Sequence, residues 1–179
     1  MTKLKVGSFF TYSGTQFDAL SPKAKDVHLV DIAHALSNIC RFNGHTTEFY
    51  SVAQHSVYVM KCCSYDNKLH ALLHDASEAY LSDIISPLKK TEEFNFYREI
   101  EDNLMDTIYK KFGLQKKMPQ EVKLSDSIVL STEIRDVTNI PKNYIKTDLE
   151  EPLDIKIIPV TPRDANLLFL EASHELGIH

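Results

Sequence analysis

The chain has 179 residues, 43% of them hydrophobic, and a formal net charge of -5. Its length fits one domain over residues 1–179, and its acidic balance argues against binding polymeric nucleic acid over a broad surface. No apolar run approaches the roughly 18 residues of a membrane span, and the first ten residues lack the apolar stretch of a signal peptide, so no membrane partner is expected. The three cysteines have no paired spacing, which fits a cytoplasmic chain.

The N-terminal region predicts an extended arm followed by a helix. Residues 8–18, SFFTYSGTQFD, place aromatic and threonine side chains around Ser13-Gly14, which favours a small hairpin or an extended arm. Residues 31–42 carry apolar side chains on one helical face. Asp31 is the candidate N-cap of this helix, and Asn43-Gly44 is the candidate end.

Two further helices are predicted between residues 51 and 86. Ser51 is a candidate cap for the first of them. Asp66-Asn67 opens the second, which we expect to end before Pro87, because proline disfavours a helical conformation in the residue before it. The second helix contains LLHDASEAYLSD, in which histidine and acidic residues interrupt an apolar stripe.

The C-terminal half predicts three more helices. Residues 92–112 combine an apolar stripe with an acidic start and a lysine-rich end, and Pro119 fits the first turn of the next helix. Residues 138–152 form a long polar loop, residues 153–160 look extended, and Thr161-Pro162 begins the last helix. The expected fold class is therefore all-α, a compact helical bundle with a minor N-terminal hairpin or arm and a short extended segment at 153–160.

A metal site is one explanation for the polar residues in LLHDASEAYLSD. Adjacent side chains on a helix diverge by about 100°, but His74 and Asp75 can still converge on one ion, and imidazole with carboxylate suits Zn, Co, Mn or Fe. A catalytic site needs further ligands, and His55 and Asp126 lie among apolar residues on neighbouring predicted helices. The alternatives are that these histidines are ordinary core or surface residues and that Asp126 pairs with an arginine.

The combined motifs give a more specific indication. Over residues 8–136 the chain resembles the HD-domain phosphohydrolase superfamily, whose ligands follow the order H…HD…D. Within it, the resemblance is to small deoxynucleotide phosphohydrolases, namely bacterial 5'-deoxynucleotidases and phage dATP triphosphohydrolases. The matching stretches are DIAHALSNICRFNGHTTEFYSVAQH, ALLHDASEAYLSD, PLK, KLSD and TEIRD.

The resemblance assigns roles to individual residues. It implies that the metal ligands are His55, His74, Asp75 and Asp126. It further implies that Glu78 is the catalytic acid or base and that Asp83 is a second carboxylate near the attacking water.

Basic and flanking residues complete the expected site. The resemblance implies that Arg41 and Lys89 contact the phosphate or sugar of the substrate. His45 is read as a phosphate contact or proton donor, with a loop-capping role as the alternative. For Glu133, in TEIRD, a structural ion-pair network is favoured over a position in the pocket.

The activity implied is metal-dependent hydrolysis of a 2'-deoxynucleotide, with a purine deoxynucleotide expected as the substrate. Triphosphate substrates such as dATP would yield deoxynucleoside and triphosphate, and monophosphate substrates would yield deoxynucleoside and phosphate. The cofactor expected is a divalent transition metal (Zn, Co, Mn or Fe), with an additional Mg²⁺ left open, and a homo-oligomer is expected. The alternatives are a non-catalytic or regulatory nucleotide-binding HD domain and a phosphodiesterase that acts on a signalling nucleotide.

Overall fold

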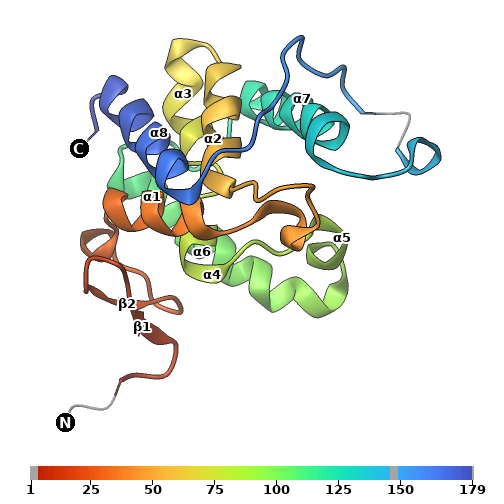
Figure 1. The fold of residues 1–179 in the computed structure, drawn as a ribbon. Helices are drawn as coiled ribbons and strands as arrows, with labels where there is room; N and C mark the ends of the chain where they lie inside the picture. The colour runs from red at the N-terminus through yellow and green to blue at the C-terminus, as the bar shows by residue number, and fades with distance from the viewer. Residues whose placement is uncertain (1–3, 146–148, 179) are drawn as a thin grey trace.

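The computed structural model describes residues 4–145 and 149–178. Helices dominate these residues, and one antiparallel hairpin of two strands lies at the N-terminal end (Figure 1). The strands are β1 (Ser8–Phe10) and β2 (Gln16–Asp18), and the helices are α1 (Leu29–Asn38), α2 (Val52–Lys61), α3 (Tyr65–Leu72), α4 (Glu78–Leu81), α5 (Ser86–Lys89), α6 (Asn95–Lys111), α7 (Gln120–Val137) and α8 (Pro162–Glu175). The prediction of a mostly helical fold with a minor hairpin is confirmed at this level.

The hairpin is tied to the helices through its turn and through one aromatic side chain. Phe17 is fully buried, and its ring stacks on Tyr80 at 4.1 Å between centroids. Ser13 donates from its backbone and its hydroxyl to the carboxylate of Asp31, at 2.6 and 2.9 Å. The expected capping role of Asp31 is therefore wrong: α1 begins two residues earlier, and the Asp31 side chain holds the hairpin turn instead.

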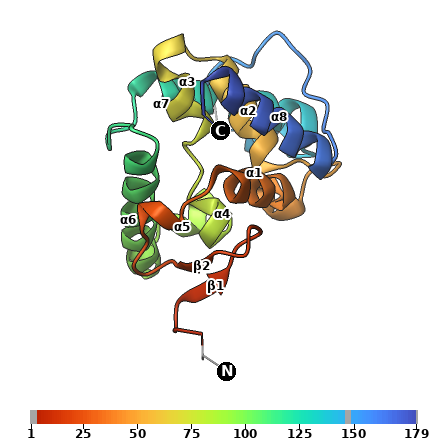
Figure 2. The same ribbon diagram turned by 90° about the vertical axis from the view of Figure 1, so that its left-hand side faces the viewer.

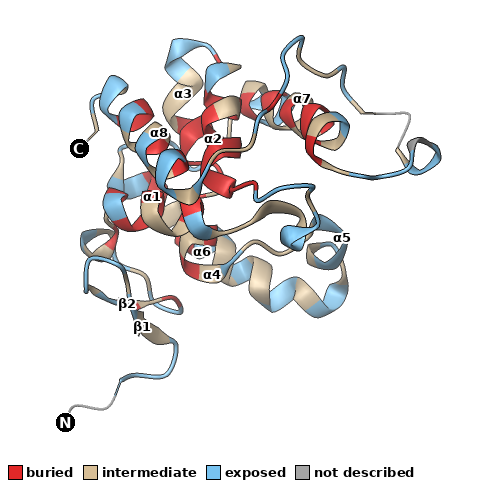
Figure 3. Cartoon of the chain, in the orientation of Figure 1, coloured by how far each residue is buried: buried red, intermediate tan, exposed pale blue. Residues whose placement is uncertain are grey.

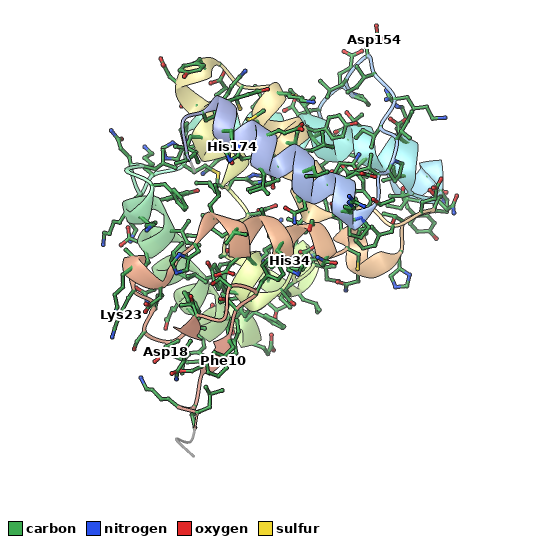
Figure 4. All side chains as sticks on the ribbon, turned by 60° about the vertical axis from the view of Figure 1, so that its left-hand side comes forward. Phe10, Asp18, Lys23, His34, Asp154 and His174 are labelled. Carbon is green, nitrogen blue, oxygen red and sulfur yellow. The ribbon has the colours of Figure 1, made fainter. Side chains whose placement is uncertain are left out.

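The outer surface of the hairpin is exposed. Figure 4 shows Phe10 and Asp18 on this arm and His34 on the neighbouring α1, and the ring of Tyr12 stacks on His34 at 3.8 Å between centroids. Viewed from the side in Figure 2, the arm lies below α1 and α4. The hairpin therefore packs along one edge of the bundle without entering its centre.

Helix α2 forms the centre of the bundle. It packs against α1, α3, α7 and α8, and Figure 3 shows most of its length as buried. The Ser51 hydroxyl accepts from the backbone N–H of Gln54 at 3.1 Å, so the predicted N-cap is confirmed. The Gln54 amide also bonds to the backbone of Ile158 and Val160 at 2.8 and 3.0 Å, so the segment before α8 is fixed to the centre of the fold.

The continuous helix predicted through LLHDASEAYLSD is wrong. Helix α3 ends at Leu72, residues 73–77 form a turn, and α4 begins at Glu78. Through the turn the backbone bonds connect residues three apart, as in the bond from Glu78 N to Asp75 O. His74 Nδ1 lies 2.7 Å from the carbonyl oxygen of Ala71. In a continuous α-helix this carbonyl would accept from the backbone N–H of Asp75.

The other predicted helices occur with shifted ends. The first helix ends at Asn38 instead of Phe42, α6 matches 92–112 except that Glu92–Phe94 is a 3₁₀ turn, and α8 ends at Glu175 instead of Gly177. Residues 153–160 are neither helical nor paired as a strand, and within the loop 138–152 residues 146–148 lie outside the described part of the chain. Across the described residues, every helix is too short or too polar to cross a lipid bilayer.

Candidate metal centre

Three segments bring the predicted ligands together. His55 comes from the buried face of α2, whereas His74 and Asp75 come from the turn between α3 and α4. One ligand atom from each of these three residues lies within 4.8 Å of the other two, so the group could hold a metal ion. Asp126, on α7, places Oδ1 3.2 Å from His55 Nε2 and 3.9 Å from His74 Nε2. The structure therefore groups three of the four predicted ligands and places Asp126 beside the two histidines.

Hydrogen bonds at the Nδ1 atoms fix the orientation of the two imidazole rings. His55 Nδ1 lies 2.6 Å from a carboxylate oxygen of Glu133, and His74 Nδ1 lies 2.7 Å from the carbonyl oxygen of Ala71. Both partners are acceptors, so each Nδ1 is the nitrogen that donates a proton. The two Nε2 atoms then face each other at 3.2 Å with their lone pairs. Such an arrangement needs a positive charge between the rings.

The electrostatics of the cluster favour a bound cation. Burial lowers the pKa of His74, but the Asp75 carboxylate outweighs this effect and raises the pKa to about 9. The pKa of His55 is also raised: burial and Arg41 oppose its charge, and Glu133 and Asp126 favour it. Burial alone would raise the pKa of Asp75, yet the two histidines and Arg41 hold it well below its usual value. The cluster therefore stabilises positive charge, which a divalent ion supplies when it replaces the protons.

Glu133 is the buried anchor of this cluster. Its side chain is fully buried, and besides His55 it accepts from Arg41 Nε and Nη2 at 3.2 and 3.0 Å. Although burial favours the neutral acid, Arg41 and His55 keep the pKa of Glu133 below its usual value. Sequence reasoning favoured a structural ion pair here and missed the bond to His55. One signal was available, because Glu133 follows Asp126 by seven residues, which places both on one face of α7.

We expect Glu133→Gln to lower the affinity for a divalent ion about 10- to 100-fold, because removing the partner of a metal-bound histidine typically has an effect of this size. The amide cannot act as an ionised acceptor for both His55 and Arg41. Competition with a chromophoric chelator measures the affinity, and circular dichroism checks that the variant is folded. Glu171→Gln, at an exposed position of α8, is the matched control. Equal affinity in the two variants would contradict the role assigned to Glu133.

Glu78 is the residue predicted to act as the catalytic acid or base. Glu78 begins α4 and is buried, and among the described residues its Oε2 atom has no hydrogen-bond partner. Its Oε1 atom lies 3.7 Å from Lys89 Nζ, and Lys89 is held by Glu101 at 2.7 Å. Burial, Asp75 and Asp83 raise the pKa of Glu78 well above its usual value, and Lys89 and Arg41 oppose this. These surroundings favour the protonated carboxyl.

Asp83 and Arg41 flank the same region. Burial raises the pKa of Asp83, with Arg41 lowering it and Asp75 raising it further. Arg41 Nη1 lies 3.7 Å from Asp75 Oδ2, so this guanidinium contacts both a predicted ligand and Glu133. Ser82, just before Asp83, has φ 69° and ψ 159°, a region that non-glycine residues rarely adopt and that is often associated with functional sites.

His45 stands apart from the other predicted residues. It follows a 3₁₀ turn formed by Arg41–Gly44 and is exposed. No contact recorded for the described side chains connects it to the cluster. Its expected role at the phosphate stays a prediction.

The sequence is similar to two bacterial proteins. It is 36% identical over 169 residues to the uncharacterized protein YfdR of Escherichia coli (strain K12), across 93% of this chain and 94% of YfdR. It is 38% identical over 120 residues to the uncharacterized protein RCAP_rcc00048 of Rhodobacter capsulatus, across 62% of this chain and 61% of that protein. No protein-family model matches the chain.

Proposed function

The chain belongs to the same family as YfdR of Escherichia coli, and we propose that it is a divalent-metal-dependent phosphohydrolase of the HD-domain type that acts on 2'-deoxynucleotides. The observation that carries this proposal is the pair of Nε2 atoms that face each other at 3.2 Å beside two carboxylates, with both Nδ1 atoms directed at acceptors. This donor set of nitrogen and oxygen suits Zn, Co, Mn or Fe.

The proposed reaction is hydrolysis of a phosphoester. His55, His74, Asp75 and Asp126 would hold the divalent ion, which would supply Lewis-acid charge for phosphoryl oxygens and lower the pKa of water. Glu78, whose raised pKa favours the neutral form, donates a proton to the leaving oxygen.

Two cations in the same region fit the charge of the transition state. Arg41 is held by Glu133, and Lys89 is held by Glu101, so both are positioned before a substrate arrives. Preorganised cations stabilise the negative charge that develops on phosphoryl oxygens. The homo-oligomer expected from the family resemblance stays a prediction.

A nucleotide panel tests the proposal. Metal-stripped protein is reconstituted with Zn²⁺, Co²⁺, Mn²⁺, Fe²⁺ or Mg²⁺ and incubated with deoxynucleoside mono- and triphosphates, with ribonucleotides as controls. We expect hydrolysis of deoxynucleotides only after reconstitution, scored by chromatography of phosphate and triphosphate, because proton-free His and Asp ligands alone do not activate water.

Three outcomes of the panel would contradict the proposal. Full activity in the chelated, metal-free sample would exclude the metal-dependent reaction. Nucleotide binding without turnover in every metal would favour the non-catalytic binding domain. Turnover restricted to a cyclic dinucleotide, added as a further substrate, would favour a signalling phosphodiesterase.

A further inference from the structure

The segment between α4 and α6 carries two residues of the proposed site, Asp83 and Lys89. It also contains one strained residue, Ser82, whose φ of 69° places a serine in the left-handed range. Such a conformation persists only where the surrounding structure holds it, and residues held in this way cluster at functional sites. The contacts that hold Ser82 therefore bear on where Asp83 lies.

Two hydrogen bonds hold Ser82, one at each end of its backbone. Its N–H donates to the carbonyl oxygen of Glu78 at 2.9 Å, and its own carbonyl oxygen accepts from the Tyr97 hydroxyl at 3.1 Å. The carbonyl of Ser82 belongs to the same planar peptide unit as the N–H of Asp83. The bond from Tyr97 therefore fixes the peptide plane at which Asp83 begins.

The ring of Tyr97 is packed against two neighbours. Its centroid lies 6.0 Å from that of Phe94, with an interplanar angle of 67°, and 5.9 Å from the ammonium of Lys89. Glu101, one helical turn after Tyr97 on α6, bonds to the same ammonium at 2.7 Å. The hydroxyl of Tyr97 is therefore carried by a side chain whose movement is restricted.

The phenol of Tyr97 keeps its proton at neutral pH. Burial, and then the charge of Glu101, raise the pKa of Tyr97 to about 12 against an opposing effect of Lys89. The charges of Glu78 and Asp83 act in the same direction as Glu101, because nearby carboxylates disfavour a further negative charge. Tyr97 therefore remains a hydrogen-bond donor beside both carboxylates of the proposed site.

The next residue of α6 holds the other end of the segment. Arg98 Nη1 donates to the carbonyl oxygen of Thr91 at 2.9 Å and to that of Lys89. Tyr97 and Arg98 therefore attach the two ends of residues 82–91 separately to the first turn of α6. Loss of the Tyr97 hydroxyl would release the end that carries Asp83 and leave the end at Lys89 attached.

We propose that Tyr97 is a positioning residue that sets the place of the Asp83 carboxylate through the Ser82 peptide. The inference rests on the proposed function, because it takes Asp83 as part of the reactive site, and it adds a residue of α6 to that site. Tyr97 acts through its bond to the backbone and takes no part in proton transfer. Without its hydroxyl, Ser82 loses a bond that offsets its strained conformation, so the peptide turns and the Asp83 carboxylate moves.

Hydrogen exchange measured by mass spectrometry tests this contact without relying on turnover. Tyr97→Phe keeps the ring and removes the hydroxyl, and Tyr65→Phe, at a 71% exposed position of α3, is the matched control. In the metal-loaded protein we expect the backbone amides of residues 82–90 to exchange at least about threefold faster in Tyr97→Phe and at an unchanged rate in the control. Unchanged exchange in residues 82–90 of Tyr97→Phe, or faster exchange spread through all of α6, would overturn the inference.

Single-turnover rates with a deoxynucleotide test whether the contact acts through Asp83. We expect Tyr97→Phe to lower the rate of the unmodified chain about tenfold with the metal content unchanged. It should lower the rate of Asp83→Asn by less than about twofold, because the effects of residues that act through one another do not add.

Two kinetic results would overturn the inference and leave the proposed function standing. One is an unchanged rate in Tyr97→Phe, and the other is a loss by the same factor in the unmodified chain and in Asp83→Asn. A metal-loaded protein that hydrolyses no nucleotide would instead exclude the proposed function, whereas the exchange measurement would still decide whether Tyr97 holds the Ser82 peptide.

Discussion

Asp75→Asn is expected to release the bound divalent ion and to abolish hydrolysis. The Asp75 Oδ2 atom lies 3.2 Å from His74 Nε2 and 3.7 Å from His55 Nε2, so it belongs to the same donor set. The amide keeps the shape of the side chain but removes the negative charge that binds the cation. Loss of one of the four predicted ligands would leave too few donors for tight binding. The metal content after gel filtration, measured by mass spectrometry, and the hydrolysis rate are the two readouts.

The control for this substitution is Asp66→Asn, the same chemical change at an exposed position on α3. It should leave the metal content and the rate at the level of the unmodified chain. Thermal unfolding of both variants separates loss of the ion from loss of the fold. An Asp75→Asn protein that keeps one ion and full turnover would refute the assignment of this residue as a ligand.

The set of candidate ligands came from the resemblance to HD-domain phosphohydrolases, because the residues alone left ordinary histidines and an Asp126–arginine pair as alternatives. These residues come from α2, from the turn between α3 and α4, and from α7. Ser51 supplied a recognisable cap, which fixed the start of α2 and therefore the face on which His55 lies. Cap chemistry and helical periodicity were sufficient for α2, but they did not select the candidate ligands.

The local geometry of the site was not accessible from sequence. Periodicity predicted one helix through His74 and Asp75. In the structure the His74 ring is hydrogen-bonded to the Ala71 carbonyl, and residues 73–77 form a turn. A contact between a side chain and its own backbone leaves no periodic signal. Asp31 illustrates the same limitation over a longer range, because its partner Ser13 lies 18 residues away and only tertiary packing brings them together.

The two roles of Glu133 explain why the centre is buried on one side and open on the other. Its carboxylate holds His55 and Arg41 from within the core, where its own side chain is fully buried. Asp75 and Asp126, in contrast, have side chains 24% and 44% exposed. The two histidines are therefore fixed from the interior, whereas Asp75 and Asp126 lie on the side that is open to solvent.

Glu78→Gln is expected to reduce kcat by a factor of about 10² to 10⁴, the usual contribution of a positioned general acid or base. Glutamine fills the same volume but cannot deliver a proton to the leaving oxygen. The Oε2 atom of Glu78 is buried without a partner among the described residues, so the substitution breaks no hydrogen bond at that atom. We therefore expect the metal content to stay unchanged and the unfolding temperature to stay the same or rise.

The measurements for Glu78→Gln are single-turnover rates, metal content and thermal unfolding, with Glu99→Gln at an exposed position of α6 as the matched control. A substrate with a more acidic leaving group needs less help from a proton donor. The rate deficit should therefore shrink with a nitrophenyl phosphoester, provided that the ester binds at the same centre. A deficit of the same size on both substrates would argue that Glu78 acts on the attacking water instead, and an unchanged kcat would remove Glu78 from the chemistry.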